Sequence, residues 1–585
     1  SGMIDLAAGE SAIRLSLSWV DWLILIIYFA MIVWIGYSIH KQQKSSEDFL
    51  LAGRSMPAWI AGLAFCAANL GATEILGMAA NGAQIGMPTI HYYLIGAVPG
   101  MVFLGIFMMP FYYGSGVRSV PEFMYQRFGK GAHIIVSLCF AVSTILQAGI
   151  NLYAMALILQ AMLGWTQWTA IIVSAVFVLA YITLGGLTSA IYNEVMQFFV
   201  IVAALIPVTV IGLSHVGGWS GLTAKLDSMQ DWSGSIHAWA GTGLGNVTNP
   251  VGGDWFSILM GLGFVLGFGY WTTNFTEVQR AFAAKSMTAA RMTPILGAIP
   301  KMLIWIIIII PGLIAAATVG NLFAGDHPVL QYNEAIPYLF KMYLPNGVLG
   351  VAITGMMASF MAGMAANVSS FNTVFTYDLW QDYVKPGKDD KYYLNMGRWI
   401  TVIGVFISVF TAWIASQFGN IMTYLQTLFS FFNAPLFAVF ILGLVWKRVS
   451  NVAGTVGYLC GILAPLVTYI LYLQSVAAGN PIFGSATAET WYGAIISCLA
   501  TWIAAAVLTP FTKSKTDEEL EGLTFGTNGI KYFKEASAEE LEDAKRAAKE
   551  AGKDVSTVKV PWYKKPLILG SVIFILGLVF YIPFF

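Results

Sequence analysis

The sequence Ala67-Ala-Asn-Leu-Gly-Ala-Thr-Glu74 sets an amide, a glycine, a hydroxyl and a carboxylate in the middle of the apolar segment 57–83. A second sequence, Gly267-Phe-Gly-Tyr-Trp-Thr-Thr-Asn-Phe-Thr-Glu277, has the same character within segment 254–281. Membrane carriers often use helices that unwind midway through the bilayer, because the freed backbone groups can bind solutes and ions there. We therefore predict two broken membrane helices.

The composition agrees with a membrane protein. Of the 585 residues 57% are hydrophobic and only 10% are charged, whereas a soluble domain carries about 25% charged residues. Lys and Arg number 30, as do Asp and Glu, so the net charge is zero and no basic footprint of a nucleic-acid partner is present. The four cysteines lie in apolar runs without ligand spacing, so we interpret them as buried hydrophobic residues.

Apolar segments long enough to span the bilayer occur fourteen times, since a spanning helix needs about 20 such residues. Helices are expected because backbone groups in lipid must be satisfied internally. The predicted spans are 19–38, 57–83, 89–111, 134–162, 168–184, 190–214, 254–281, 293–319, 346–377, 396–417, 422–445, 451–474, 490–510 and 566–584. The two broken spans are five apart, which suits an inverted repeat of five helices plus five, with one span before it and three after.

Basic residues accumulate in cytoplasmic loops. With the N-terminus outside, 26 of the 30 Lys and Arg residues fall inside. We therefore predict a multi-pass protein of the plasma membrane, most simply a bacterial inner membrane, with both termini extracellular or periplasmic. The predicted parts are an N-terminal segment with an extra span (1–56), a ten-helix core (57–445), further spans (446–510), a cytoplasmic linker (511–565) and a last span (566–585). In the linker, Ser537 and Glu540 have the spacing of a capping box that starts a helix.

Four ionisable residues lie within predicted spans, where such groups indicate function. Glu74 and Lys301 lie deep in their spans, which favours a role with a solute or an ion. Glu277 stands three residues before Arg280, so a local structural pair is expected there. Glu194 begins a span, and the choice between a functional and a merely interfacial role stays open.

Residues 19–475 resemble the solute:sodium symporter family, and within it the sodium/glucose cotransporter branch. The resemblance rests on the order and spacing of several sequence blocks. These blocks are Asp48-Phe-Leu-Leu-Ala-Gly-Arg-Ser55, Ala67-Ala-Asn69, Val120-Pro-Glu-Phe123, Arg127-Phe-Gly129, Gly185-Gly-Leu187, Ile191-Tyr192, Gln279-Arg280, Ala283-Ala-Lys-Ser286, Phe375-Thr-Tyr-Asp378, Trp446-Lys-Arg448 and Ala453-Gly454. The family implies an all-α membrane fold with a LeuT-like core.

The resemblance also implies a central sugar site. The residues at its positions are Asn69, Glu74, Tyr93, Tyr270, Trp271, Lys301 and Gln426, and Asn274 and Thr276 are assigned to a gate. Amides and charges suit the hydroxyl edge of a sugar, and an aromatic ring suits its apolar face. Two departures put the particular sugar in doubt: Tyr93-Leu94 stands where the branch has Glu-Trp, and Glu74 stands where it has Gln or His.

A third departure concerns the family's sodium site. The resemblance places it at Ala67 and Leu70, through their carbonyls, and at Ser359, Ala362 and Gly363. Serine or threonine normally occupies the last two positions, and a hard cation needs such oxygens. Ser369 and Ser370 would restore them only if the register were shifted. Glu74 and Glu194 are then candidate proton carriers, so coupling to sodium through an altered site, to a proton, or to nothing stays open.

The function expected is secondary transport of a sugar or related polyol by alternating access, with no cofactor other than Na⁺ as a possible coupling ion. The alternatives are a symporter of another solute, such as a carboxylate or an amino acid, and a solute sensor. A channel fits broken helices less well. An enzyme is disfavoured, because no nucleophile–base arrangement, metal cluster or phosphate loop is evident. Nothing in the sequence predicts an oligomeric state.

Overall fold

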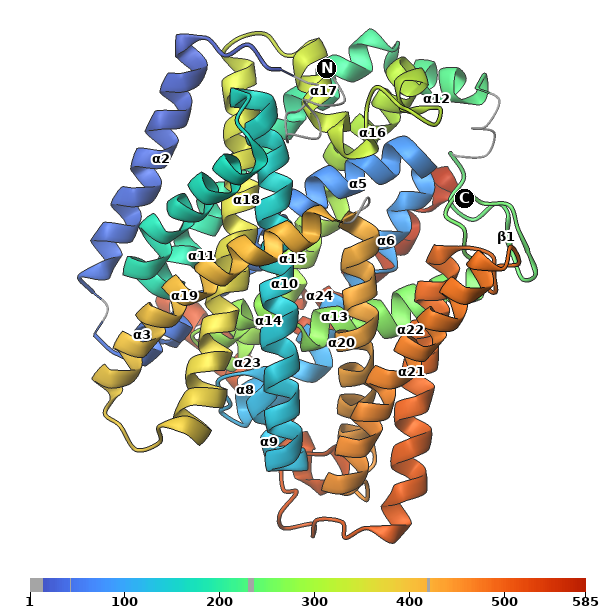
Figure 1. Cartoon of the computed structure of the whole chain (residues 1–585). Helices are drawn as coiled ribbons and strands as arrows, with labels where there is room; N and C mark the ends of the chain where they lie inside the picture. Colours follow the sequence, from blue (N-terminus) through green and yellow to red (C-terminus); the bar gives the residue numbers. More distant parts are fainter. Residues whose placement is uncertain (1–13, 43, 230–235, 418–420) are drawn as a thin grey trace.

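The chain folds into a bundle of long helices (Figure 1). The structure, a computed structural model, describes residues 14–42, 44–229, 236–417 and 421–585. Within these ranges the strands are limited to a two-residue antiparallel hairpin, β1 (Thr242–Gly243) with β2 (Asn246–Val247). The expectation of an all-α membrane protein is confirmed.

The α-helices follow one another along the whole chain, with short 3₁₀ and π segments (η) between them. They are α2 (Trp19–His40), α3 (Ser46–Leu51), η1 (Ala52–Arg54), α4 (Ala58–Asn69), α5 (Ala72–Ile85), η2 (Met87–Ile90), α6 (His91–Leu94), α7 (Val98–Phe103), η3 (Leu104–Met108), α8 (Met109–Gly114), α9 (Val120–Phe128), α10 (Lys130–Leu163), α11 (Gln167–His215), α12 (Gly218–Asp227), η4 (Ser257–Gly267), α13 (Phe268–Thr273), α14 (Phe275–Phe282), α15 (Met287–Leu303), α16 (Trp305–Val319), η5 (Gly320–Phe323), η6 (Tyr332–Glu334), α17 (Ala335–Tyr343), α18 (Val348–Thr373), η7 (Val374–Val384), α19 (Asp390–Ser416), α20 (Ile421–Val445), α21 (Asn451–Ala477), α22 (Ala486–Leu508), η8 (Thr509–Phe511), η9 (Phe525–Gly529), α23 (Ile530–Glu550), η10 (Trp562–Lys564), α24 (Pro566–Val579) and η11 (Ile582–Phe584).

The number of spans can be compared with the fourteen predicted. Among the described residues, eleven helices are long and apolar enough to cross a membrane, and two bent helix pairs raise the number to thirteen. The predicted span 168–184 lies within the first part of α11, of which the stretch Gln167–Ala180 is apolar. Gly186 then kinks α11 at φ 60°, a backbone conformation that glycine adopts easily. The count of fourteen is therefore not confirmed, although a helix occupies every predicted segment.

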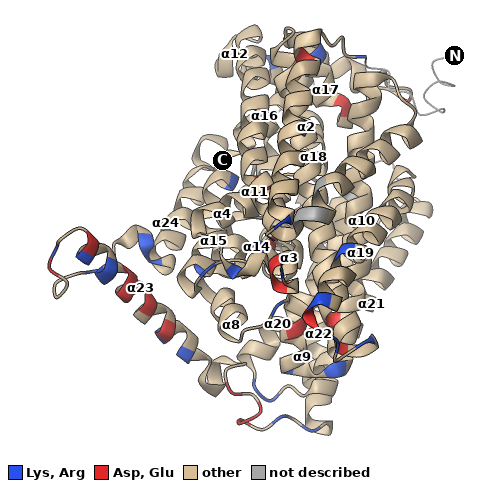
Figure 2. Ribbon diagram, turned by 90° about the vertical axis from the view of Figure 1, so that its left-hand side faces the viewer, with Lys and Arg blue, Asp and Glu red and all other residues tan. Residues whose placement is uncertain are grey.

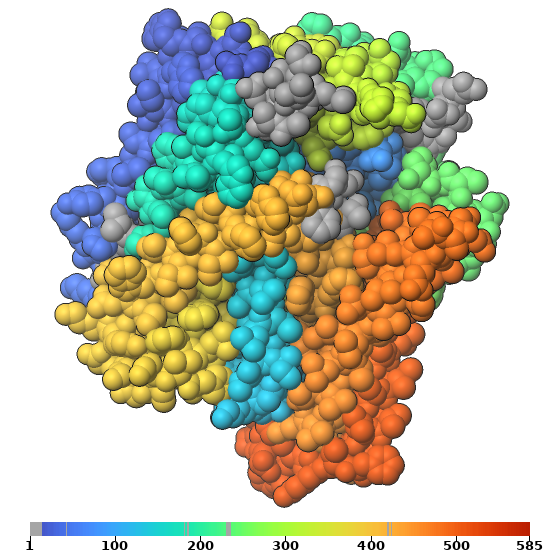
Figure 3. Space-filling model, viewed as in Figure 1, coloured from blue at the N-terminus to red at the C-terminus, as the bar shows by residue number. Residues whose placement is uncertain are grey.

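Two groups of helices surround the bent pairs. The helices α10, α11, α18 and α19 pack on one another, while α15 and α16 pack on α4 and α5. On the face in Figure 3, a strip of α10 lies exposed between α19 and the group α20 to α22. The pair α5 and α16 approach closely, because a Cβ added at Gly82 would lie 2.8 Å from the carbonyl oxygen of Ile309. The bent pairs are thus enclosed by helices rather than exposed to lipid.

The linker 511–565 lies against the end of the bundle where charges gather, around α3, α9 and α23 in Figure 2. Its helix α23 begins at Ile530, so Ser537 lies inside the helix and the predicted capping box is wrong. The reason is tertiary packing, since the rings of Phe525, Tyr532 and Phe533 all contact Phe111 of α8 and hold the earlier turns in place.

Candidate functional site

The first predicted break is present between α4 and α5, whose axes differ by 60°. Leu70 leaves the helix with φ −79° and ψ 52°, and its amide turns back to the carbonyl of Ala67 at 3.0 Å. Gly71 then precedes α5 in an extended conformation. The helix therefore stops and restarts within two residues, inside the bundle.

The second predicted break separates α13 from α14, with an angle of 50°. Asn274 adopts the extended conformation and caps α14, because its side-chain oxygen accepts a hydrogen bond from the Thr276 amide at 3.3 Å. Both restarted helices carry Thr and then Glu as their second and third residues, Thr73-Glu74 in α5 and Thr276-Glu277 in α14. Each carboxylate therefore lies in a first turn, where free amides and the helix dipole favour negative charge.

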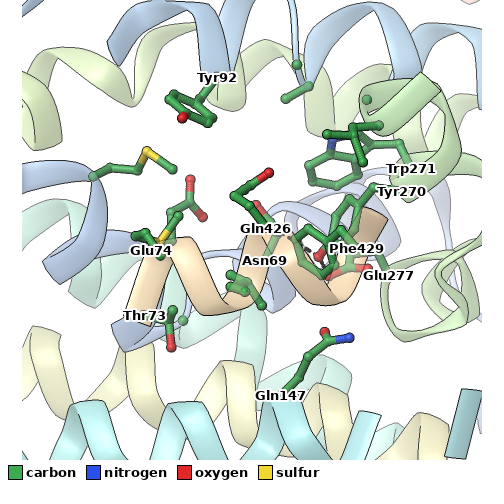
Figure 4. A pocket seen from close by; sticks show the side chains of 18 of the residues that line it. Asn69, Thr73, Glu74, Tyr92, Gln147, Tyr270, Trp271, Glu277, Gln426 and Phe429 are labelled. Carbon is green, nitrogen blue, oxygen red and sulfur yellow. Dashed lines mark hydrogen bonds between the residues drawn. The ribbon is translucent and has the colours of Figure 1, made fainter. Parts of the chain in front are cut away.

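A cavity of about 130 Å³ lies between the two breaks. All seven residues predicted to contact the solute line it, although they come from five separate parts of the chain. They are Asn69, Glu74, Tyr93, Tyr270, Trp271, Lys301 and Gln426. Figure 4 shows the Gln426 side chain reaching toward the middle of this space, with Glu74 on one side and Tyr270 and Trp271 on the other.

Lys301 of α15 is the cation at the centre of the site. Its ammonium group donates to Glu74 Oε1 at 2.5 Å and also to Asn69 Oδ1. The same nitrogen lies 5.1 Å from the ring centre of Tyr93 and 5.5 Å from that of Trp271, within the range of cation–π attraction. Lys301 thus joins both sides of the first break.

Tyr270 joins the two breaks. Its hydroxyl accepts a hydrogen bond from Asn69 Nδ2 at 2.9 Å and donates to Glu277 Oε1. Its ring packs against Phe429 of α20, with 4.6 Å between the ring centres. A continuous line of polar contacts therefore runs from Lys301 through Asn69 and Tyr270 to Glu277.

Other residues of the cavity wall were not predicted. They are chiefly Gln147 and Asn151 of α10, Glu277, Asn367 of α18 and Phe429. Gln147 and Asn151 stand four residues apart, so a helix places them on one face. Two amides on one face of an apolar span are a signal in the sequence that could have identified them.

The expected pair between Glu277 and Arg280 is wrong. Arg280 instead donates through Nε to Glu194 Oε2 at 3.0 Å and through Nη2 to Glu194 Oε1, and both side chains are fully buried. The third nitrogen, Nη1, donates to the Thr276 carbonyl at 2.8 Å. Glu194 is thus bound by an arginine of α14. The fold brings α11 beside α14, and a guanidinium that binds both oxygens of one carboxylate forms a strong, bidentate ion pair.

Four of the five residues predicted for sodium, Ala67, Leu70, Ser359 and Gly363, lie at the first break. Ser359 of α18 donates its hydroxyl to the Leu70 carbonyl at 2.5 Å. Neither Ala362 nor Gly363 carries a side-chain oxygen. A Cβ added at Gly363 would lie 2.9 Å from Gly71 Cα and 3.0 Å from Asn151 Nδ2. The Asn151 side chain therefore fills the space that a hydroxyl-bearing residue at position 363 would need.

The assigned gate residues lie on the side of the cavity that leads to α3. Thr276 shares a hydrogen bond of 2.9 Å with Ser370 of α18, whereas Asn274 caps its own helix. Beyond them, Gln279 donates to the Leu50 carbonyl at 3.0 Å and to Thr373 Oγ1 at 2.8 Å. These bonds join α14 to α18 and α3, so this side of the cavity is closed.

A second cavity, of about 190 Å³, adjoins the central one on the opposite side. The two share Tyr92, Met422 and Gln426 as wall residues. Amide and hydroxyl side chains from α5 and α22, including Gln84 and Thr490, line it further. It provides a polar approach to the central site.

Comparison with known proteins gives a consistent picture. The profile of the sodium:solute symporter family matches residues 49–461. The chain is 28% identical over 480 residues to a sodium/glucose cotransporter of Vibrio parahaemolyticus, covering 79% of this chain and 87% of that one. It is 26% identical over 537 residues to the human sodium/myo-inositol cotransporter 2, covering 87% and 79%. Among solved structures, an outward-open Na⁺-coupled sialic acid symporter superposes with a TM-score of 0.71 at 18% identity, over 86% of this chain and all of that one.

Proposed function

The chain belongs to the sodium:solute symporter family, and from this membership we propose that it carries a sugar or a related polyol across the membrane together with sodium. It is a multi-pass membrane protein with a LeuT-like fold and a secondary active transporter, not an enzyme. The observation that carries the proposed solute class is the convergence of amides, charges and aromatic rings on one cavity between two broken helices.

The charge arrangement favours a neutral solute over a carboxylate. Lys301 is already paired with Glu74 at 2.5 Å, so an anionic solute would have to displace an internal carboxylate. Displacement would leave Glu74, whose side chain is only 12% exposed, without its partner, which costs several kcal/mol. The hydroxyl groups of a sugar, in contrast, can form hydrogen bonds to Gln426, to Asn69 and to the remaining polar atoms of Lys301 and Glu74 without breaking that ion pair. An apolar sugar face fits against Trp271 and Phe429.

Sodium is proposed to bind at the first break through an altered set of oxygens. The carbonyls of Ala67 and Leu70 and the Ser359 hydroxyl remain from the expected set. The amide of Asn151, which adjoins both Gly71 and Gly363, supplies an oxygen in place of the two absent hydroxyls. Amide oxygens are acceptable ligands for hard cations. A site with fewer hydroxyl ligands would hold sodium weakly.

We also propose how the chain is oriented in the membrane and which part of it moves. Both termini are placed on the outer face, and the end of the bundle with α23 is placed in the cytoplasm, where most basic residues lie (Figure 2). The core 57–445 then moves between an outward and an inward state, with the broken pairs α4–α5 and α13–α14 shifting against α10, α11, α18 and α19. The second cavity becomes the entrance, and Asn274 and Thr276 belong to the inner gate.

Uptake into proteoliposomes tests this function. The full-length protein should accumulate labelled glucose, galactose or myo-inositol when a sodium gradient points inward. Gln426→Ala should weaken competition by the unlabelled solute about tenfold, which is the effect of about 1.4 kcal/mol. The control is Ser430→Ala, on the same helix, whose hydroxyl bonds to the Thr427 carbonyl at 2.8 Å. Binding and uptake of none of these solutes would refute the proposal.

A further inference from the structure

Glu277 differs from the other two carboxylates that the sequence marked within the membrane. Glu74 is paired with Lys301 and Glu194 with Arg280. Glu277 is 2% exposed, and one of its oxygens accepts the Tyr270 hydroxyl. Its other oxygen, Oε2, is buried and has no hydrogen-bond partner within the described ranges. Of these three carboxylates, Glu277 is thus the one that forms no ion pair in the part of the chain that the structure describes.

The charged and titratable groups around α14 are all engaged elsewhere or neutral. Arg280 of α14 itself is bound by Glu194, and Lys301 of α15 is bound by Glu74 and Asn69. Arg291 of α15 contacts the carbonyls of Gly105 and Ile106 and the carboxylate of Glu540. The remaining groups on the helices packed against α14 are the Tyr112 and Tyr113 hydroxyls of α8, which bond to the carbonyls of Thr272 and Ala284, Cys66 of α4 and Tyr270 of α13.

A buried carboxylate without a cation costs several kcal/mol as an anion. Three partners could remove that cost: an inorganic cation, a cationic group of the solute, or a proton. The first two need room beside Oε2, and this oxygen is buried even though Glu277 belongs to the wall of the central cavity. A proton needs no such room and leaves the Tyr270 bond to the first oxygen intact. The geometry therefore favours a proton on Oε2.

The contacts of Tyr270 connect this carboxylate to the solute site. Lys301 donates to Asn69 Oδ1, Asn69 Nδ2 donates to the Tyr270 hydroxyl, and that hydroxyl donates to Glu277. A solute hydroxyl that bonds to Asn69 or Lys301 changes the first of these bonds, and the change reaches Glu277 through Tyr270. Glu277 need not touch the solute to respond to it.

We propose that Glu277 is a proton-binding site of the transport cycle, so that a proton moves with the solute in addition to sodium. The proton comes from water on the outer side, forms an O–H bond with Oε2, and returns to water on the inner side when that bond breaks, with no oxidation or reduction. The proposal rests on the proposed transport function, which supplies the solute that the relay through Asn69 and Tyr270 senses.

A pH-sensitive dye inside proteoliposomes tests the coupled movement. Solute uptake by the wild type, with sodium gradient and membrane potential held fixed, should acidify the interior. Glu277→Gln imitates the protonated side chain, so this variant should still bind solute. Its solute-dependent acidification should be at least tenfold smaller than that of the wild type. Solute uptake by the wild type without acidification would overturn the proton site and leave the proposed function standing.

Infrared spectroscopy of the protein in detergent tests the site without transport. The wild type should show the C=O stretching band of a protonated carboxyl at neutral pH, and Glu277→Gln should remove it. The matched control is Glu74→Gln, at the equivalent position after the first break, which should keep the band. A wild type without a band that depends on Glu277 would overturn the proposal. Presence of the band together with failure of every sugar and polyol to bind would overturn the proposed function alone.

Discussion

The two broken helices have the same local design and different chemistry. Each restarts with Thr and Glu, at Thr73-Glu74 and at Thr276-Glu277, and each places the carboxylate in its first turn. After the first break the carboxylate is bound by a lysine, whereas after the second it is bound by a tyrosine hydroxyl. The first site is therefore electrically balanced and suited to anchor a neutral solute, while the second holds a carboxyl group that forms no ion pair within the described residues.

The difference also appears in how each break is fixed. At the first break, Gly71 offers no side chain, and the bend is held from outside by Ser359 of α18 and the Asn151 side chain. At the second break, Asn274 caps the new helix with its own side chain. The first break thus depends on its neighbours, which makes it sensitive to what binds between α5 and α18. The second is held by this local bond in addition to neighbours, since Thr276 bonds to Ser370 of α18 and the Thr272 carbonyl accepts from Tyr112 of α8.

Removal of Lys301 should break the charge balance of the first site. Lys301→Met leaves the mostly covered Glu74 beside a neutral side chain, which costs about 3–5 kcal/mol. The free energy of unfolding in detergent should fall by that amount, and solute affinity should fall by more than about a hundredfold.

The double variant Lys301→Met/Glu74→Gln should regain most of that stability, because no buried charge is left unpaired. Thermal unfolding of the two variants and the wild type measures the recovery. If Lys301→Met alone were as stable as the wild type, the ion pair between Lys301 and Glu74 would not distinguish the first break from the second.

Tyr270→Phe should separate the two breaks from each other. The change removes the acceptor of the Asn69 bond and the donor to Glu277, and a lost buried hydrogen bond costs about 1–3 kcal/mol. Solute affinity should fall about tenfold, and binding should lose its dependence on pH. Titration calorimetry at several pH values measures both effects.

The control for this change is Tyr92→Phe, another tyrosine of the cavity wall that lies outside the line of contacts from Lys301 to Glu277. It should leave the pH dependence of binding as it is. A Tyr270→Phe protein whose binding still followed the pH as in the wild type would show that Glu277 and the solute site are independent.

Gly363→Ser tests whether the first break can take back a hydroxyl ligand. The new Cβ would lie 2.9 Å from Gly71 Cα, which is backbone and cannot yield easily. We expect a loss of stability of about 1–3 kcal/mol, as for overpacked cores, and no gain in sodium affinity. Asn151→Ala should instead raise the sodium concentration that gives half-maximal uptake.

Sodium titrations of uptake compare these two variants directly. Stronger sodium dependence in Gly363→Ser would mean that the hydroxyl fits and that Asn151 does not take its place. An unchanged sodium dependence in Asn151→Ala would exclude its amide as a ligand.

Much of the fold, including the two broken helices, was predictable from the sequence. Polar residues in the middle of apolar runs located both breaks, because such residues are rare in lipid-facing helices. The positions implied by the family resemblance gave seven residues that the fold brings to one cavity. The count of fourteen spans is not confirmed, because the segment 168–184 lies in the first part of α11, before the kink at Gly186, and is not among the eleven long apolar helices.

The pairings of charges were not predictable. Spacing along one helix favoured Glu277 with Arg280, but the fold places Glu194 of α11 where its two oxygens accept from Nε and Nη2 of the guanidinium. Likewise, Ser537 and Glu540 have the spacing of a cap, but aromatic contacts with Phe111 start α23 seven residues earlier. In both cases contacts between distant parts of the chain outweighed a local pattern worth less than about 1 kcal/mol.

Asn274→Ala should have the smallest effect, and it sharpens the difference between an internally capped break and one held by its neighbours. The change removes the side-chain bond to the Thr276 amide, which costs about 1 kcal/mol, whereas Asn274→Ser keeps a capping oxygen and should cost only a few tenths. The free energy of unfolding in detergent measures both. Since Glu277 follows in the same turn, a loosened cap should also blunt the solute-dependent acidification in Asn274→Ala more than in Asn274→Ser. Equal stability and equal acidification in the two variants would mean that the second break, like the first, is held by its neighbours.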